Sequence, residues 1–259
     1  MGKISKIGRI FYGIAMLEIG LQAIYCHDFP YILSHPKNFP VPGLPILAII
    51  LGIIFALAGI CIAFGKKARQ ISLLFGSLLL LMFCFYYIPY EFLAGPNYMH
   101  LGEWENAEKE LALAGGALVI AGCFARENES PLTRFLERLI PCGAILFAVP
   151  MISFGILHFL AAKEASNYIP AWIPWHLFWM YFCGAALIGS GIAIVLKIKI
   201  ALIASLLGTM IFIWFIALHI PRVIASPLVD LGAEVTSAFL ALAYSGIAFV
   251  IAGTIKKTL

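Results

Sequence analysis

Charged residues are scarce in this chain. Of its 259 residues, 12% are charged and 63% are apolar, and the mean hydropathy is +1.00. A soluble domain keeps roughly 25% charged residues because its surface must face water. This composition therefore excludes a soluble fold and indicates that lipid faces most of the surface. The net charge of +4 is too small to indicate a nucleic-acid partner.

Paired cysteines and compact catalytic motifs are also missing. The six cysteines stand at positions 26, 61, 84, 123, 142 and 183, with no Cys-x-x-Cys spacing. A thiol–disulfide exchanger needs paired, reachable thiols, so this activity is excluded, and the cysteines are expected to be small buried residues. The chain has no H-E-x-x-H sequence and no nucleotide- or iron–sulfur-binding pattern.

Long apolar runs dominate what is present. A helix needs about 20 apolar residues to cross a bilayer, and the segments between such runs are short. Glu18 and Gln22 interrupt the first run, which distinguishes it from a cleaved signal peptide and predicts a retained span. We predict an all-α, polytopic membrane protein with spans at about residues 7–27, 44–64, 69–89, 107–125, 139–161, 175–196, 199–220 and 233–255.

Basic residues are distributed unequally between the two sides of this eight-span arrangement. Thirteen lie on one side and four on the other. Cytoplasmic loops carry the excess of Lys and Arg, so both termini are predicted to be cytoplasmic and the protein to lie in the inner membrane. The thirteen are Lys3, Lys6, Arg9, Lys66, Lys67, Arg69, Arg126, Arg134, Arg138, Lys197, Lys199, Lys256 and Lys257; the four are Lys37, Lys109, Lys163 and Arg222.

An internal repeat organises the chain. At a shift of 132 residues, Pro42, Gly52, Gly59, Gly76, Phe83, Ile88 and Pro89 meet Pro174, Gly184, Gly191, Gly208, Phe215, Ile220 and Pro221. At a shift of 131, Glu103, Ala112, Gly115, Ala121 and Gly122 meet Glu234, Ala243, Gly246, Ala252 and Gly253, and at 135 Gly20 meets Gly155. Glycine and proline direct the backbone, and an Ile-Pro pair is expected to end the third and seventh spans.

The repeat predicts two tandem four-helix bundles. Residues 1–125 form the first and degenerate unit, 139–259 the second, and 126–138 a charged, solvated linker between them. Four spans per unit make the copies parallel, so they are expected to superpose by rotation about the membrane normal.

Polar residues at membrane depth are costly and suggest a functional site. In the second unit, His158 and His219 lie near the outer ends of their spans, whereas His176 and Glu234 begin theirs. We predict that these four catalytic candidates converge at the outer face. Arg222, Trp172, Trp175 and Trp179 are expected to bind the ligand.

Simpler structural roles are also consistent with these residues. The tryptophans are typical of an interfacial aromatic belt, and single histidines can satisfy carbonyl groups at helix ends. The first unit keeps Glu103 for Glu234 but carries no histidine at the three matching positions. If it has a site of its own, the candidates are Glu18, Gln22, His27, Tyr87, Glu91 and Glu103.

Three chemistries fit the histidine set. Three imidazoles and a carboxylate can ligate a divalent metal, and two facing histidines can hold a haem. A quinone ring is the third fit, because His and Arg can donate to its carbonyls, Glu can move protons and aromatic residues can enclose the ring. Spacing does not choose among them.

The second unit resembles the DoxX family of four-helix membrane proteins. The resemblance rests on His158-Phe159, on the segment from Trp172 to Ile188 (WIPWHLFWMYFCGAALI), and on IALHIPRV followed by a glutamate. It implies the four-helix fold and a quinone-linked redox role, since the family takes its name from a subunit associated with a quinol oxidase and a thiosulfate:quinone oxidoreductase. Other relatives include cargo receptors and chaperones.

The sequence thus predicts a small-molecule or redox site at the outer face of the second unit. Quinone is the favoured cofactor, ahead of haem or metal, and electron transfer would need a redox partner subunit. The alternative is a non-enzymatic carrier, receptor or assembly factor for a lipid or small hydrophobic molecule. The lipid bilayer is the expected environment, nucleic acid is not an expected partner, and a homo-oligomer is compatible with the sequence.

Overall fold

The computed structural model describes residues 2–28, 43–93, 99–126, 130–226, 230 and 232–254. Within these ranges the secondary structure is helical throughout, which confirms the all-α prediction. The longer helices are α1 (Lys3–Cys26), α2 (Leu44–Phe64), α3 (Ala68–Met82), α5 (Glu105–Gly122), α7 (Gly143–Leu160), α9 (His176–Val195), α10 (Ile200–Trp214) and α12 (Ala233–Thr254). The shorter ones are α4 (Ile88–Leu93), α6 (Pro131–Leu136), α8 (Ala162–Ala165), α11 (Ile220–Ala225), η2 (Phe83–Tyr87), η3 (Leu101–Trp104), η4 (Glu137–Cys142), η5 (Ser166–Tyr168) and η6 (Phe215–His219).

Seven helical segments in the described residues are long and apolar enough to cross a membrane. They match seven of the eight predicted spans and establish a multi-pass membrane protein. The expected span at 107–125 corresponds to α5, whose 18 residues begin with four charged side chains among the first six. Most of the remainder of α5 is buried, so protein rather than lipid surrounds this helix.

The Ile-Pro pairs do not end their spans, contrary to the prediction. Each helix instead passes through a π-helical turn, η2 or η6, and continues to Leu93 or Ala225. Proline lacks an N–H and its ring crowds the carbonyl of the preceding turn. A widened π turn accommodates Pro89 and Pro221 without breaking the helix.

The linker is also more ordered than the sequence suggested. Residues 127–129 lie outside the described part, but α6 and η4 continue directly into α7, so the fifth span starts near Pro131 rather than residue 139. Glu137 is buried and accepts from Arg126, with Nε to Oε2 at 2.7 Å, and from Arg69 on α3. A salt-bridged joint therefore ties this segment to the first half.

The six cysteines, all within the described residues, form no disulfide with one another, in agreement with their scattered spacing. Cys183 is buried, as expected. Cys84 and Cys142 are exposed instead, because each lies on a part of a helix that faces away from the protein interior.

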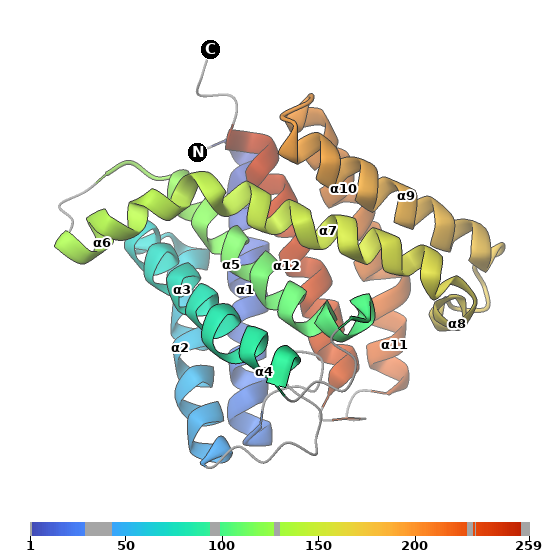
Figure 1. Ribbon diagram of the computed structural model, residues 1–259, viewed down its shortest axis with the longest axis horizontal. Coiled ribbons are helices and arrows are strands. Elements are labelled where there is room, and N and C mark those ends of the chain that lie inside the picture. The colour runs from blue at the N-terminus through green and yellow to red at the C-terminus, as the bar shows by residue number, and fades with distance from the viewer. Residues whose placement is uncertain are drawn as a thin grey trace.

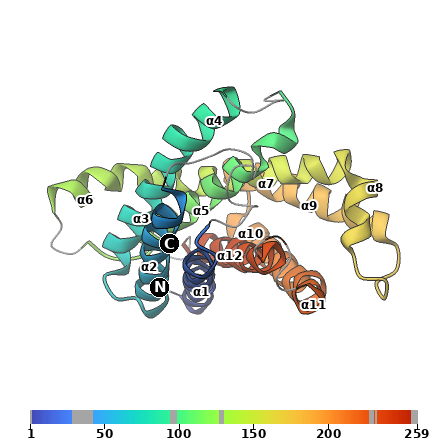
Figure 2. The ribbon, with the colours of Figure 1, turned by 90° about the horizontal axis from the view of Figure 1, so that it is seen from below.

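The long helices form one closed ring. Around it, α2 packs against α1, α1 against α12, and α12 against α10; α9, α7, α5 and α3 complete the circuit, and α5 also touches α12 across the middle. Figure 1 shows α7 and α9 side by side and steeply inclined to α1 and α12, and Figure 2 shows α1 and α12 side by side with α5 and α7 above them. The first helix of each half thus packs on the last helix of the other half.

Close glycine contacts recur at the repeat offsets. A methyl group added to Gly246 would lie 2.5 Å from the carbonyl oxygen of Gly8, and one added to Gly115 would lie 2.6 Å from that of Gly143. These are equivalent crossings, α1 on α12 and α7 on α5. Because backbone approach of this kind requires glycine, we propose that the two halves are copies of one unit, with the first helix of each packed on the last helix of the other. Pro42 of the sequence alignment lies outside the described residues.

Basic residues gather at one end of the ring. Arg9 stacks over Phe124 at 5.7 Å from the ring centroid, and Arg69 Nη1 donates to the carbonyl oxygens of Ala121 and Phe124 at 3.0 and 2.9 Å. Figure 1 places the start of α1, the end of α12 and the turn between α9 and α10 at this same end.

Candidate functional site

A cavity of about 610 Å³ lies in the second half, at the end away from the basic residues. Its walls come from α7, α9, α10 with η6, and α12, and the segment from Ala161 to Ile169 closes one side. This volume is within the usual range for a small-molecule site, about 300–1,000 Å³. Apolar side chains form most of the lining, with a few polar groups among them.

His158 lines this cavity near the end of α7. Its Nδ1 lies 2.7 Å from the carbonyl oxygen of Phe154, one turn earlier. A carbonyl oxygen only accepts, so Nδ1 must carry the proton. In the neutral ring, Nε2 is then a hydrogen-bond acceptor.

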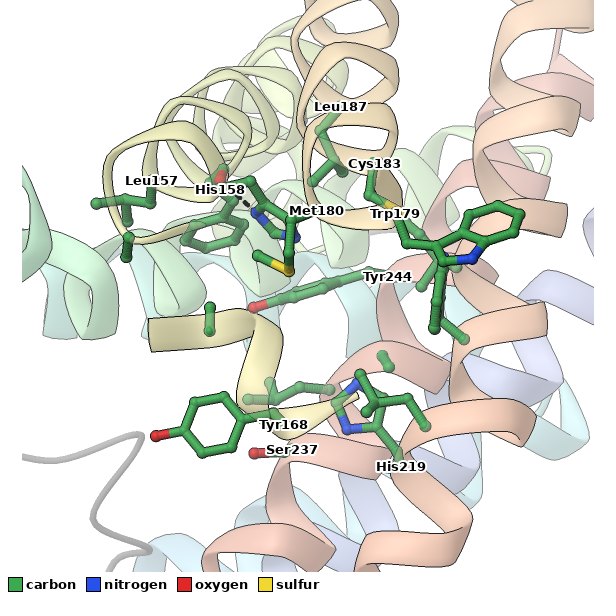
Figure 3. A pocket seen from close by; sticks show the side chains of 18 of the residues that line it. Leu157, His158, Tyr168, Trp179, Met180, Cys183, Leu187, His219, Ser237 and Tyr244 are labelled. Atoms are coloured by element: carbon green, nitrogen blue, oxygen red, sulfur yellow. Dashed lines mark hydrogen bonds between the residues drawn. The ribbon is translucent and has the colours of Figure 1, made fainter. Parts of the chain in front are cut away.

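His219 and Tyr244 line the same cavity, and Figure 3 shows the phenol ring of Tyr244 between the two imidazoles. His219 ends the π turn η6, which re-aims side chains relative to a regular helix. Within the described residues, neither His219 Nδ1 nor the Tyr244 hydroxyl has a hydrogen-bond partner, although both atoms are buried. Such groups cost free energy unless a partner satisfies them.

Aromatic and sulfur-containing side chains complete the wall. Trp179 and Trp214 meet edge to face, with centroids 5.8 Å apart, and Trp179 Nε1 donates to the carbonyl oxygen of Pro174 at 3.1 Å. Met151, Met180, Met210 and Cys183 also line the cavity. Aromatic edges and flexible thioethers adapt to a flat ring.

The first half contributes to the cavity through α5. Glu105 and Lys109 both line it, and Lys109 Nζ lies 2.8 Å from Glu105 Oε1 and 3.1 Å from Asn106 Oδ1. This pair reaches the cavity because α5 packs on α7. The site is therefore shared between the halves.

An ion pair stands beside the cavity. Arg222 Nε donates to Glu234 Oε2 at 2.7 Å, and Arg222 Nη2 pairs with Glu234 Oε1. The guanidinium also lies over the ring of Tyr168, 4.4 Å from its centroid. Arg222 and Glu234 are one turn from the lining residues His219 and Ser237 respectively, so this cluster fixes the side of the cavity formed by η6, α12 and η5.

The structure brings together only part of the predicted set. His158, His219 and Trp179 line the cavity, and Arg222 with Glu234 flanks it. His176 instead lines a separate shallow hollow together with Trp175 at the start of α9. Trp172 and Trp175 are 68% and 77% exposed, because the turn before α9 carries them outward.

The alternative residues of the first half are dispersed. Gln22 of α1 reaches the second half, where it donates to the carbonyl oxygen of Gly232 at 2.8 Å and accepts from Thr236 at 2.7 Å. His27 and Glu103 are exposed, whereas Tyr87 and Glu91 are buried. Across the described residues, no cluster of three or more His, Cys, Asp or Glu side chains could hold a metal ion.

Several residues that line the cavity were not predicted from the sequence. Ser237, Ala241 and Tyr244 follow one another at intervals of four and three residues, which places them on one stripe of α12. That spacing was available as a signal for Tyr244. Glu105 and Lys109 gave no comparable signal, since their part in the site depends on the packing of α5 against the other half.

Comparison with known families identifies part of the chain. The DoxX family model matches residues 5–88, which confirms the resemblance to this family over that segment. The match lies in the first half, which carries none of the cavity histidines, whereas the motifs that resemble the family lie in the second half. No curated protein and no solved structure matches the chain.

Proposed function

We propose that the protein binds a small hydrophobic ring compound of the quinone and quinol class in the cavity of its second half. The observation that carries this proposal is the placement of His158, His219 and Tyr244 around one apolar space. Two of these three side chains have a buried polar atom without a partner in the described residues. A ligand with polar ring substituents would satisfy them.

The side chains that line the cavity favour a ligand with a flat ring rather than one that consists only of a flexible chain. Trp179, Trp214 and Tyr244 offer ring faces and edges, and the thioethers of Met180 and Met210 adapt to the ligand outline. A cavity of about 610 Å³ also leaves room for a short hydrophobic tail.

Electron transfer would take place with a partner subunit that carries a cofactor, because the chain itself has no nucleotide- or iron–sulfur-binding pattern. A carrier for a small hydrophobic molecule would use the same cavity. The two functions differ in outcome. A carrier moves its ligand between vesicles without changing the ligand's absorption spectrum, whereas a redox protein changes that spectrum when its partner membranes are added.

Binding can be measured by calorimetry in detergent with 1,4-naphthoquinone and, under anaerobic conditions, its quinol. Wild-type protein should bind at least one form saturably. The double variant His158→Ala/His219→Ala should lose binding, while His176→Ala, outside the cavity, should retain it. Saturable binding that survives the double variant, or no saturable binding of either form to the wild type, would overturn the proposal.

We also propose that the protein lies in the inner membrane with its basic end in the cytoplasm. Exposed Arg134 and Lys163 lie near opposite ends of α6 to α8. In a cysteine-free variant of the full chain, a membrane-impermeant maleimide added from outside should label Lys163→Cys and spare Arg134→Cys. The reverse pattern would invert the orientation.

A further inference from the structure

This inference rests on the proposed function. The hydrogen-bonding groups of the cavity wall indicate which chemical form of the ring compound binds best. Quinone carbonyls only accept hydrogen bonds, so they need donors. His158 cannot supply one in its neutral form, because its single N–H is already donated to the carbonyl oxygen of Phe154 at 2.7 Å. In this tautomer His158 therefore offers an acceptor rather than a donor to a ligand.

Among the other polar side chains that line the cavity, Tyr244 complements His158. The Tyr244 hydroxyl is buried, has no hydrogen-bond partner in the described part of the chain, and can donate. Figure 3 shows the ring of Tyr244 next to that of His158, with Met180 beside both. This corner of the cavity thus offers one acceptor, His158 Nε2, and one free donor, Tyr244.

We infer that the ligand presents an aromatic hydroxyl group to this corner, donating to His158 Nε2 and accepting from Tyr244. A hydroxyl performs both roles with one atom, whereas a carbonyl or an ether oxygen can only accept. The hydroxylated form of the ring compound, a phenol or a quinol, is accordingly the preferred ligand, and the oxidised quinone is the weaker one.

Three compounds of similar size separate the possibilities: 4-methoxy-1-naphthol has one hydroxyl, 1,4-dimethoxynaphthalene has none, and 1,4-naphthoquinone has two carbonyls. At about pH 8, where histidine is neutral, wild-type protein should bind the naphthol about tenfold more tightly than the dimethoxy compound, as expected for one well-made hydrogen bond. The quinone, which cannot donate to His158 Nε2, should bind less tightly than the naphthol.

Two variants locate the effect. His158→Phe should abolish the preference, so that the naphthol and dimethoxynaphthalene bind equally, and Tyr244→Phe should reduce the preference in the same direction. His176→Phe is the matched control and should keep it. Equal binding of naphthol and dimethoxynaphthalene to the wild type, or a preference that persists in His158→Phe, would overturn this inference while leaving the proposed function intact. Failure of all three compounds to bind would remove both.

Discussion

The two halves differ in side-chain size at equivalent positions of the repeat, including positions that line the cavity in the second half. Leu187 lies on the cavity wall, and its counterpart at the 132-residue offset is Phe55, which is 2% exposed and meets Phe75 edge to face at 4.9 Å. His158 corresponds to Ala23 at the offset of 135, and Ala23 is fully buried. The first half thus fills with aromatic rings a region that the second half leaves open.

The polar residues of the two interiors differ as well. At the offset of 131, the cavity residue Ala241 corresponds to Glu110, which is 2% exposed and whose Oε1 has no hydrogen-bond partner among the described residues. The second half has a small alanine at this position, and its cavity is lined by polar side chains that include His158, His219 and Tyr244. The comparison teaches that the helix crossings are common to both halves, whereas side-chain volume and charge decide which half can receive a ligand.

The largest effect is expected at the crossings that both halves share. Gly246→Val and Gly115→Val each force side-chain atoms into a backbone carbonyl of the neighbouring helix, Gly8 or Gly143. Each should cost about 3 kcal/mol or more and remove most folded protein, because backbone cannot yield as a side chain can. Size-exclusion profiles and melting temperatures measure this. Gly189→Ala, which meets nothing within 4 Å, is the control; if one crossing tolerates valine, the halves are not equivalent there.

Removing a charged side chain at the outer end should destabilise the protein less than the glycine substitutions, and the loss should differ between the two halves. Arg222→Ala leaves Glu234 without its cation, and we expect a loss of about 2 kcal/mol, less than for a fully buried pair because the side chains are 26% and 20% exposed. The first-half equivalent Glu103 is exposed, so Glu103→Ala should change stability by less than about 0.5 kcal/mol. Thermal unfolding of both variants tests the difference.

The double variant Arg222→Met/Glu234→Gln checks the physical reason for that loss. Removing both charges together should recover most of the stability, since no uncompensated charge remains. If the double variant is as unstable as Arg222→Ala, the contact of Arg222 with Tyr168 rather than the ion pair stabilises this region.

Creating space in the interior of the first half should lower the free energy of unfolding by less than Arg222→Ala does. Phe55→Leu places the second-half residue at the first-half position and removes part of the contact with Phe75. We expect a loss of about 1 kcal/mol, between the cost of removing one methyl group and that of removing a whole ring. A loss above about 3 kcal/mol in chemical or thermal unfolding would mean that the first half cannot relax around the space.

The reciprocal change should affect binding more than stability. Leu187→Phe introduces a ring into the cavity wall, where free space accommodates it, so unfolding should shift by less than about 1 kcal/mol. Naphthol binding should weaken at least tenfold, measured by the same calorimetry. Undiminished affinity would place the ligand in another part of the cavity.

Much of the fold could be predicted from local information. The apolar runs gave the spans, and the spacing of glycine and proline gave the offsets at which Gly115 and Gly246 make equivalent contacts. Only part of the site could be predicted in this way. The alternating direction of the spans predicted that His158 and His219 lie at the same end, and both line the cavity. The backbone of Trp175 has a positive φ of 57°, and α9 starts from it in a direction that leaves His176 outside the cavity.

The sequence by itself determined that this chain is a helical membrane protein, because the length of an apolar run and the scarcity of charge act on each segment independently. The tertiary structure decided which helices share a site. Packing of α5 on α7 brings Glu105 and Lys109 of the first half to a cavity of the second. It also decided what His158 can do, since its bond to the Phe154 carbonyl fixes the proton on Nδ1 and leaves an acceptor facing the cavity. These properties depend on contacts between atoms that no local pattern of residues encodes.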